Sequence, residues 1–138
     1  MKLDAILQTR SKKDDISVCF ISRDNKILIG LRNYKANEWK DVSVWTVPGG
    51  HCEDGETFEE TLRREAFEEC GISNLTITEY MGVVPGAKEG DTVYVFKAET
   101  NEEPKLMEPE NFSEWKWCAI SDIPSNFINP AALKLITH

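Results

Sequence analysis

Apolar and polar residues alternate, or form short β-branched runs, in several segments of the chain, and this pattern predicts β-strands. In residues 91–98, for example, Thr92, Tyr94 and Phe96 fall on one side and the intervening valines on the other. The polar residues 22–25 separate two such runs, which indicates a hairpin. Strands are predicted over residues 5–7, 16–21, 26–31, 44–47, 75–84, 91–98 and 114–120, with an interruption at Gly82 in the fifth of them.

Two other segments have helical spacing. Thr57, followed three residues later by Glu60, has the form of a capping box, and Gly71 suits a left-handed cap, so a helix of about four turns is predicted over residues 57–70. A second, short amphipathic helix is expected over residues 130–136. Strands interrupted by one long helix and closed by another predict an α+β sandwich.

The segments between the predicted strands and helices also have informative sequence patterns. Pro48-Gly49-Gly50 predicts a tight turn whose glycines let a backbone carbonyl approach a ligand. Residues 34–41 form a polar loop that contains Trp39, and the acidic, proline-containing residues 99–110 are expected to be a mobile connection.

The predicted long helix turns from apolar to acidic along one face. At about 100° per residue, Phe58, Leu62, Glu65 and Glu69 fall within about 60° of one another, and Glu68 lies about 60° beyond Glu65. A solvated helix face is the ordinary explanation of an acidic pair. Three carboxylates this close repel one another unless a cation lies among them. Oxygen donors without a nearby histidine or cysteine pair favour Mg²⁺ or Mn²⁺.

The spacing of the residues around this helix is more specific than any acidic pair. Its fixed points are Gly50, Glu56 after five residues, Arg64-Glu65 after seven more, then Glu68-Glu69 and Gly71-Ile72. The segment resembles the signature of the Nudix hydrolases, Gly-x5-Glu-x7-Arg-Glu-U-x-Glu-Glu-x-Gly-U, where U is a bulky aliphatic residue. Ala66 departs from it, because a larger aliphatic side chain is usual at that position.

The resemblance covers residues 16–136 and implies the Nudix fold, an α/β/α sandwich with a central mixed sheet and a catalytic loop-helix-loop, in a single domain over residues 1–138. It implies that water attacks a pyrophosphate linkage with the help of Mg²⁺ or Mn²⁺. The implied catalytic residues are Glu65, Arg64 and Glu56, with Arg64 pairing with Glu56 and holding Glu65 in place. The implied metal ligands are Gly50, through its carbonyl, Glu65, Glu68, Glu69 and an acid from the loop before the last strand, for which Glu110 is chosen over Glu108 and Glu114.

The substrate is less strongly indicated. Arg32 is a candidate phosphate contact, or else a solvated residue at a strand end, and Trp45 and Tyr94, with Trp39 and Phe112, are the aromatic candidates for stacking on a base. His51 is either a surface residue or an acid–base group. The Pro-Gly-Gly-His opening and the strand ending that begins at Trp117 resemble nucleoside triphosphate pyrophosphohydrolases, which release a monophosphate and pyrophosphate.

Two alternatives remain open at this point. Residues 84–86, Val-Pro-Gly, resemble a downstream proline motif of ADP-ribose and nucleotide-sugar hydrolases. Some Nudix-like domains only bind nucleotides as sensors, but those usually lack a signature acid, whereas Glu56, Glu65, Glu68 and Glu69 are all retained here. An enzyme is therefore favoured over a sensor.

Composition limits the partners. The 138 residues carry a formal charge of −8, which argues against binding to nucleic-acid polymers or anionic membranes and leaves a small-molecule nucleotide as the expected partner. No apolar stretch has the length of a membrane span or signal peptide, so a cytoplasmic protein is expected. The four cysteines lack zinc-site spacing and are expected to be reduced. The sequence predicts no oligomeric state.

Overall fold

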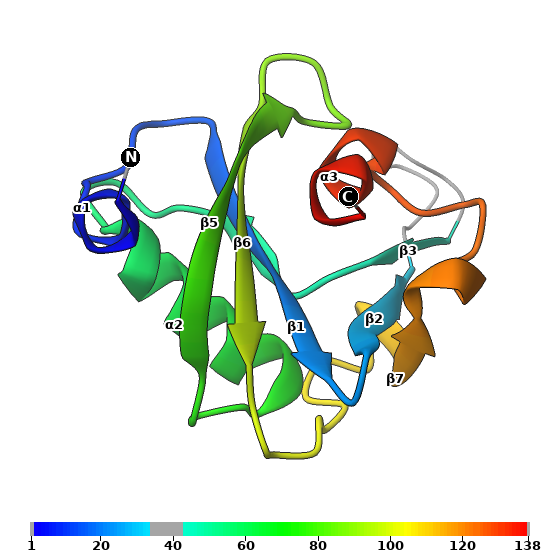
Figure 1. The fold of residues 1–138 in the computed structure, drawn as a ribbon. Helices are drawn as coiled ribbons and strands as arrows, with labels where there is room; N and C mark the ends of the chain where they lie inside the picture. Colours follow the sequence, from blue (N-terminus) through cyan, green and yellow to red (C-terminus); the bar gives the residue numbers. More distant parts are fainter. Residues whose placement is uncertain (1, 34–42, 138) are drawn as a thin grey trace.

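A seven-stranded mixed β-sheet forms the centre of the computed structural model, which describes residues 2–33 and 43–137 (Figure 1). The order of the main strands is β3-β2-β1-β6-β5, and β4 and β7 pair with β1 and β2 respectively. Strands β1 and β6 are parallel and the other pairs are antiparallel. The strands are β1 Asp15–Arg23, β2 Lys26–Arg32, β3 Val44–Thr46, β4 Gly49–His51, β5 Thr76–Pro85, β6 Thr92–Glu99 and β7 Phe112–Ala119.

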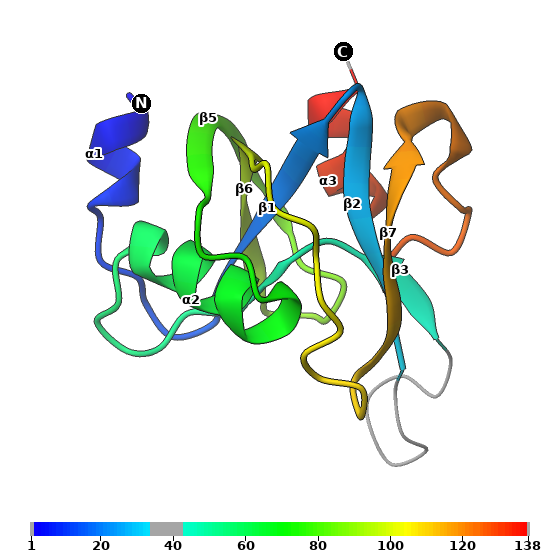
Figure 2. The same cartoon turned by 90° about the horizontal axis from the view of Figure 1, so that it is seen from below.

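Helices cover both faces of this sheet. Helices α1 (Leu3–Leu7) and α2 (Phe58–Cys70) lie on one face and α3 (Pro130–Ile136) on the other, with the 3₁₀ turn η1 (Ile120–Asp122) after β7 (Figures 1 and 2). Successive residues of β6 are buried on opposite faces of the sheet. Val95 packs toward α3 and Phe96 toward α2, and neither side chain is exposed. The predicted α+β sandwich with a mixed central sheet is thereby confirmed.

The β1–β2 hairpin opens into a fork, and the fork creates the site. Asp24 and Asn25 form its turn with positive φ angles of 52° and 64°. The two strands pair directly near that turn, at Ser22–Ile27 and Arg23–Lys26. Strand β7 pairs with β2 along the whole of its other edge, but farther from the turn β2 pairs with β3 instead of β1, at residues 30–32, while β4 pairs with residues 16–18 of β1. Strand β4 therefore lies inside the fork, in the middle of the sheet.

Two local predictions were wrong. Residues 5–7 belong to helix α1 rather than to a strand, because Leu3, Ile6 and Leu7 share the helical face that packs on the core beside α2. The glycine pair 49–50 is part of β4 rather than a tight turn. Gly49 has φ +151°, and a Cβ there would lie 2.4 Å from the Ser17 carbonyl oxygen, so glycine allows close backbone pairing with β1.

Two other predictions need adjustment. Gly82 does not interrupt its strand, because β5 continues through it with a register shift between Tyr80 and Gly82, as at a β-bulge. Residues 99–110, expected to be mobile, make defined contacts with the end of α2 and the segment that follows it. Glu102 accepts hydrogen bonds from the Ser73 and Asn74 amides at 2.9 and 2.5 Å, and the Lys105 amide donates to the Cys70 carbonyl at 2.8 Å.

Within residues 2–33 and 43–137, no helix has both the length and the apolar character needed to cross a membrane.

Candidate active site

Helix α2 carries the acidic residues and is defined at both ends by its own sequence. The Thr57 hydroxyl accepts from the Glu60 amide at 3.1 Å, and the Glu60 carboxylate accepts from the Thr57 amide at 2.8 Å, which completes the predicted capping box. Gly71 ends the helix with φ 68°. Leu62 and Ala66 are buried against the sheet, so the small side chain that departs from the signature still packs in the core.

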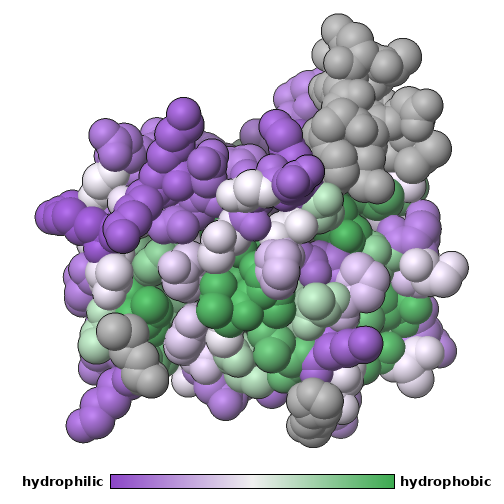
Figure 3. All heavy atoms as spheres, turned by 90° about the horizontal axis from the view of Figure 1, so that it is seen from above, coloured by the Kyte–Doolittle hydropathy of each residue, from purple (hydrophilic) through white to green (hydrophobic). Residues whose placement is uncertain are grey.

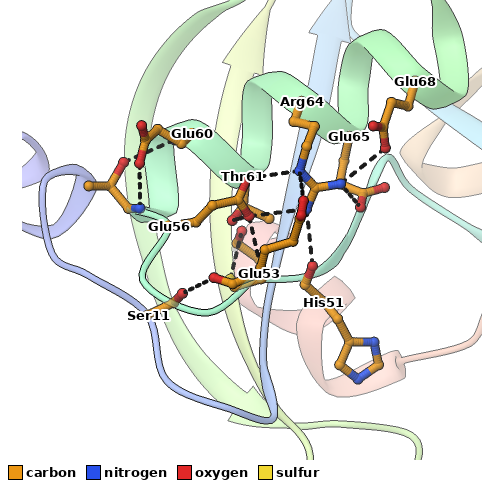
Figure 4. A network of polar contacts seen from close by, with 12 residues as sticks. Ser11, His51, Glu53, Glu56, Glu60, Thr61, Arg64, Glu65 and Glu68 are labelled. Atoms are coloured by element: carbon orange, nitrogen blue, oxygen red, sulfur yellow. Dashed lines mark hydrogen bonds and ion pairs between the residues drawn. The ribbon is translucent and has the colours of Figure 1, made fainter.

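Arg64 is the centre of a network of carboxylates (Figure 4). Its Nε and Nη2 donate to the two Glu56 oxygens at 2.8 and 3.1 Å. Its Nη1 donates to Glu65 at 2.8 Å and to Glu68 at 3.0 Å, and its Nη2 reaches the His51 carbonyl at 3.2 Å. One guanidinium thus joins the loop before α2, the helix itself and the end of β4, and the structure contains the ion pair that the signature implied.

Glu56 is held in its charged form. The bidentate hydrogen bonds from Arg64 lower the pKa of Glu56 from 4.5 to about 2, with help from the Glu53 amide at 2.8 Å and the Thr61 hydroxyl at 2.7 Å. The same contacts raise the pKa of Arg64. This pair therefore remains ionised across the physiological pH range and can act as a fixed support.

Glu65 and Glu69 extend from α2 to β4. The Gly49 amide donates to Glu69 at 3.0 Å. A Cβ built on Gly50 would lie 2.9 Å from the Glu65 carboxyl group. Gly50 thus makes room for the Glu65 carboxylate, and the Gly49 amide holds the Glu69 carboxylate, inside the fork. The predicted common face of Glu65 and Glu69, next to residues 48–50, is present in the structure.

Burial shifts the pKa values of Glu65 and Glu69 upward, in the opposite direction from that of Glu56. Burial raises the pKa of Glu65, and the nearby charges of Glu68 and Glu108 add to this while Arg64 opposes it. Glu69 is only 5% exposed, and its burial raises its pKa well above the usual value, with further repulsion from Glu65 and Glu108. The site therefore contains acids whose charged forms need a cation for stabilisation.

The donor set fits a hard divalent cation. Glu65, Glu68, Glu69 and the Gly50 carbonyl offer only oxygen atoms, which suits Mg²⁺ or Mn²⁺. In the part of the chain that the structure describes, no three acidic, histidine or cysteine side chains converge on one point, and Arg64 takes up an oxygen of both Glu65 and Glu68. The absent Cβ of Gly50 beside the partly buried Glu65, and the buried Glu69 at Gly49, are the features that favour a cation there.

Glu108 and Glu110, two of the acids in the loop before β7, have different surroundings. Glu110 is exposed in the turn that precedes this strand. Glu108 is partly buried, and its charge raises the pKa of both Glu65 and Glu69. The sequence offered both acids, but an irregular loop has no period from which the orientation of a side chain could be predicted.

A cavity of about 280 Å³ meets the acidic residues at β4. Its apolar lining comes from the sheet face that α3 covers, and Glu69 reaches it from the α2 side. Figure 3 views the molecule from the side of the β5–β6 loop and shows apolar surface (green) bordered by hydrophilic side chains (purple). The lining includes apolar Ile16, Val18, Phe20, Val93, Phe127 and Ala132 and polar Arg32, His51, Glu69, Lys88, Asp91 and Asn129.

The predicted substrate residues divide into two groups. Arg32 lines the cavity, partly opposes the burial that raises the pKa of Glu69, and lies over the Phe112 ring at 5.2 Å, and Phe112 is itself part of the lining. Trp45 instead packs in the core with Lys116 over its ring at 4.5 Å. Tyr94 projects to the α2 face and stacks on Phe58 at a centroid distance of 4.3 Å. The structure does not bring these two aromatic residues to the cavity.

Several residues of the cavity lining were not predicted from the sequence, and one predicted residue is not described by the structure. Trp39, the remaining aromatic candidate, lies outside the described residues. Phe127, Asn129 and Lys88 line the cavity but were not predicted, since no local motif marks them and only the packing of distant segments brings them there. His51 has a largely exposed side chain and faces Asp91, with 3.4 Å between Nε2 and Oδ2.

Comparison with known proteins agrees with this geometry. Residues 12–138 match the NUDIX domain. The chain is 31% identical over 97 residues to the NAD-capped RNA hydrolase NudC of Mannheimia succiniciproducens, an alignment that covers 70% of this chain and 36% of that protein. It is 29% identical over 85 residues to a Bacillus subtilis protein with a proposed 8-oxo-dGTP diphosphatase activity, covering 62% of this chain and 56% of that protein.

A solved structure extends the likeness to the fold. The MutT NUDIX hydrolase of Burkholderia pseudomallei superposes with a TM-score of 0.73 at 25% identity, over 92% of this chain and 100% of that one. The chain spans only about a third of the length of the NudC relative, but the domain match covers most of its own length. The signature residues, the fork with its acidic helix and the domain match agree, and the chain belongs to the Nudix hydrolase family.

Proposed function

We propose that this chain, acting as one domain, hydrolyses a pyrophosphate linkage in a nucleoside diphosphate derivative with the help of Mg²⁺ or Mn²⁺. The favoured substrate is a nucleoside triphosphate, which yields the monophosphate and pyrophosphate. The observation that carries the proposal is the delivery of two carboxylates, the partly buried Glu65 and the buried Glu69, to the glycine pair of β4 at one end of an apolar cavity.

The proposed ligands of the cation are Glu65, Glu68, Glu69 and the Gly50 carbonyl. Glu108 is preferred to Glu110 as the additional acid, because its charge acts on both Glu65 and Glu69. When bound, the cation neutralises phosphate charge and acidifies the attacking water.

The protein side chains supply the base and its support. Glu65 accepts the proton of the attacking water. Arg64 donates to Glu65 and is in turn held by the ionised Glu56, so this pair orients the base. Arg32 contacts a substrate phosphate from the side of the cavity. Most of the expected rate enhancement therefore comes from positioning and charge neutralisation.

The relatives favour a second candidate substrate. A protein that shares 31% identity with this chain is named for the hydrolysis of NAD-capped RNA, and NAD contains a diphosphate that joins two nucleosides. A diphosphate diester of this kind, or ADP-ribose or a nucleotide sugar, would present the same phosphoanhydride bond. The Bacillus subtilis relative supports a triphosphate instead.

The test is a substrate panel with purified protein. Nucleoside triphosphates, NAD, ADP-ribose and nucleotide sugars are incubated with and without Mg²⁺, and products are separated by ion-exchange chromatography. We expect Mg²⁺-dependent release of pyrophosphate from at least one triphosphate. Glu65→Gln should lower turnover by orders of magnitude without a change in the circular dichroism spectrum, whereas Glu79→Gln, an exposed acid on β5, should behave as wild type.

The same panel separates the alternatives. Cleavage of the diesters alone would favour the second candidate. Binding of a nucleotide without any metal-dependent product would instead identify a sensor that has kept the signature acids.

A further inference from the structure

We propose that Lys88 is a specificity-determining residue that binds the phosphate chain opposite Arg32 and selects triphosphates over diphosphate diesters. The proposal rests on the proposed function, since it concerns the same cavity and the same bond. Lys88 belongs to the β5–β6 loop and lines the cavity together with Arg32 and Glu69. No sequence motif singles it out.

The strand pairing explains how the loop reaches the acidic site. The loop leads into β6, which pairs in parallel with the beginning of β1 at Ile16–Val93. On its other edge, the same part of β1 pairs with β4 at Ser17–Gly50. The loop is thus only two strand spacings, or roughly 10 Å, from β4. The contact between His51 of β4 and Asp91 at the loop end, 3.4 Å, shows that the two segments meet.

Arg32 approaches the same strand from the other side of the fork. It is the last residue of β2, which pairs with β1 only at residues 26 and 27 and at Arg32 pairs with β3 and β7. The two cations of the cavity lining therefore flank Gly49 and Gly50, where the carboxylates of α2 arrive. A phosphate chain held at Gly50 would have Arg32 on one side and Lys88 on the other.

Charge balance explains why two cations favour a triphosphate. A nucleoside triphosphate carries roughly four negative charges at neutral pH, about twice the number of a diphosphate diester. A divalent cation balances about two of them. The diester is then nearly neutral, whereas the triphosphate keeps about two charges for Arg32 and Lys88 to match. Because the protein has a net charge of −8, a positively charged side chain at this position favours the binding of a polyanion.

The loop is held by contacts that do not involve the Lys88 side chain, so this side chain can be replaced to test its role. The Gly86 amide donates to the Asp91 carbonyl at 2.8 Å, and the Asn129 side chain donates to the Pro85 carbonyl at 3.0 Å. The loop contact between the Asp91 amide and Lys88 uses the Lys88 backbone carbonyl, at 3.2 Å. Replacement of the side chain by alanine should therefore leave the loop in place.

The experiment compares Lys88→Ala, Lys88→Arg and the control Lys26→Ala, an exposed lysine at the opposite end of the sheet. The kcat/KM is measured for a triphosphate and for ADP-ribose. Isothermal titration calorimetry gives the Kd of an α,β-methylene triphosphate analogue, a readout that does not depend on turnover. We expect Lys88→Ala to lower kcat/KM for the triphosphate up to roughly fivefold and to weaken analogue binding by a similar factor, as for one exposed ion pair.

The difference between the effects on the triphosphate and on ADP-ribose decides the test. ADP-ribose hydrolysis should change less than triphosphate hydrolysis, Lys88→Arg should restore most of the loss, and Lys26→Ala should have no effect. Equal losses for both substrates, or an unchanged Kd in Lys88→Ala, would overturn the proposal. If the wild type bound the analogue but cleaved neither substrate, the proposed function would fail by itself, while the Kd comparison would still decide the role of Lys88. Failure of the wild type to bind the analogue would overturn both.

Discussion

The Glu56–Arg64 pair offers the sharpest quantitative prediction. Glu56→Gln keeps the size of the side chain but removes the charge that accepts two hydrogen bonds from Arg64. It also weakens the bonds from Thr61 and the Glu53 amide, because a neutral amide oxygen is a poorer acceptor than a carboxylate. Arg64 would then face a neutral partner inside a network built for its charge.

The magnitude follows from the pKa of Glu56. A decrease from 4.5 to about 2 corresponds to roughly 3 kcal/mol of preference for the charged form in the folded state. Both side chains are partly exposed, 18% for Glu56 and 24% for Arg64, so solvent screening reduces the expected loss of unfolding free energy to about 2 kcal/mol at pH 7. Because the folded pKa is the lower one, this contribution is complete above about pH 4.5 and disappears as the pH falls toward about 2.

Urea denaturation of wild type and Glu56→Gln at pH 7, 5, 4 and 3 measures this contribution. The difference in unfolding free energy should be largest at pH 7 and should shrink steadily below pH 4.5, with equal m-values for the two proteins. Glu79→Gln, on the exposed surface of β5, should show no comparable difference. Equal stability of wild type and variant at pH 7, or a difference that stays constant down to pH 3, would refute the reasoning.

Three further predictions concern the fold. Thr57→Ala removes half of the capping box and should cost about 1 kcal/mol in thermal or urea unfolding, and no loss would contradict the capping role. Gly49→Ala should prevent native folding, judged by circular dichroism, because its Cβ would meet a backbone oxygen at 2.4 Å, whereas Gly90→Ala meets open space and should cost only the strain of its positive φ. Burial raises the pKa of Cys19 to about 12, so iodoacetamide at pH 8 should label this thiol only after unfolding, as read by peptide mass spectrometry.

The elements that the sequence predicted well are those with local signals. Helix α2 begins and ends at its capping residues, and α3 covers residues 130–136 as expected. The hairpin turn lies at Asp24 and Asn25, which tolerate positive φ. Each of these signals acts over a few residues, so it can be recognised without knowledge of the rest of the fold.

The errors arose where pairing partners are distant. The glycine pair 49–50 has the local form of a turn, but β1, more than 30 residues away, recruits it as a strand. Residues 5–7 are too few to distinguish a strand from a helix by period. Trp45 and Tyr94 are aromatic residues of suitable size for stacking on a base, but the faces that their strands bury place them elsewhere.

By itself, the sequence determined the acidic face of the long helix, because helical period and capping chemistry are properties of contiguous residues. The family, and the closeness of Glu65 and Glu69 to residues 48–50, were indicated by the resemblance of this segment to the Nudix signature. Only the tertiary structure decided which other groups lie near them: the opening of the β1–β2 fork, the cavity under α3, the nearness of Glu108 and the presence of Lys88 and Arg32 in the lining of one cavity. These contacts depend on which distant strands pair and on how irregular loops lie over them. The residue spacing within a single segment predicts neither the pairing nor the loop positions.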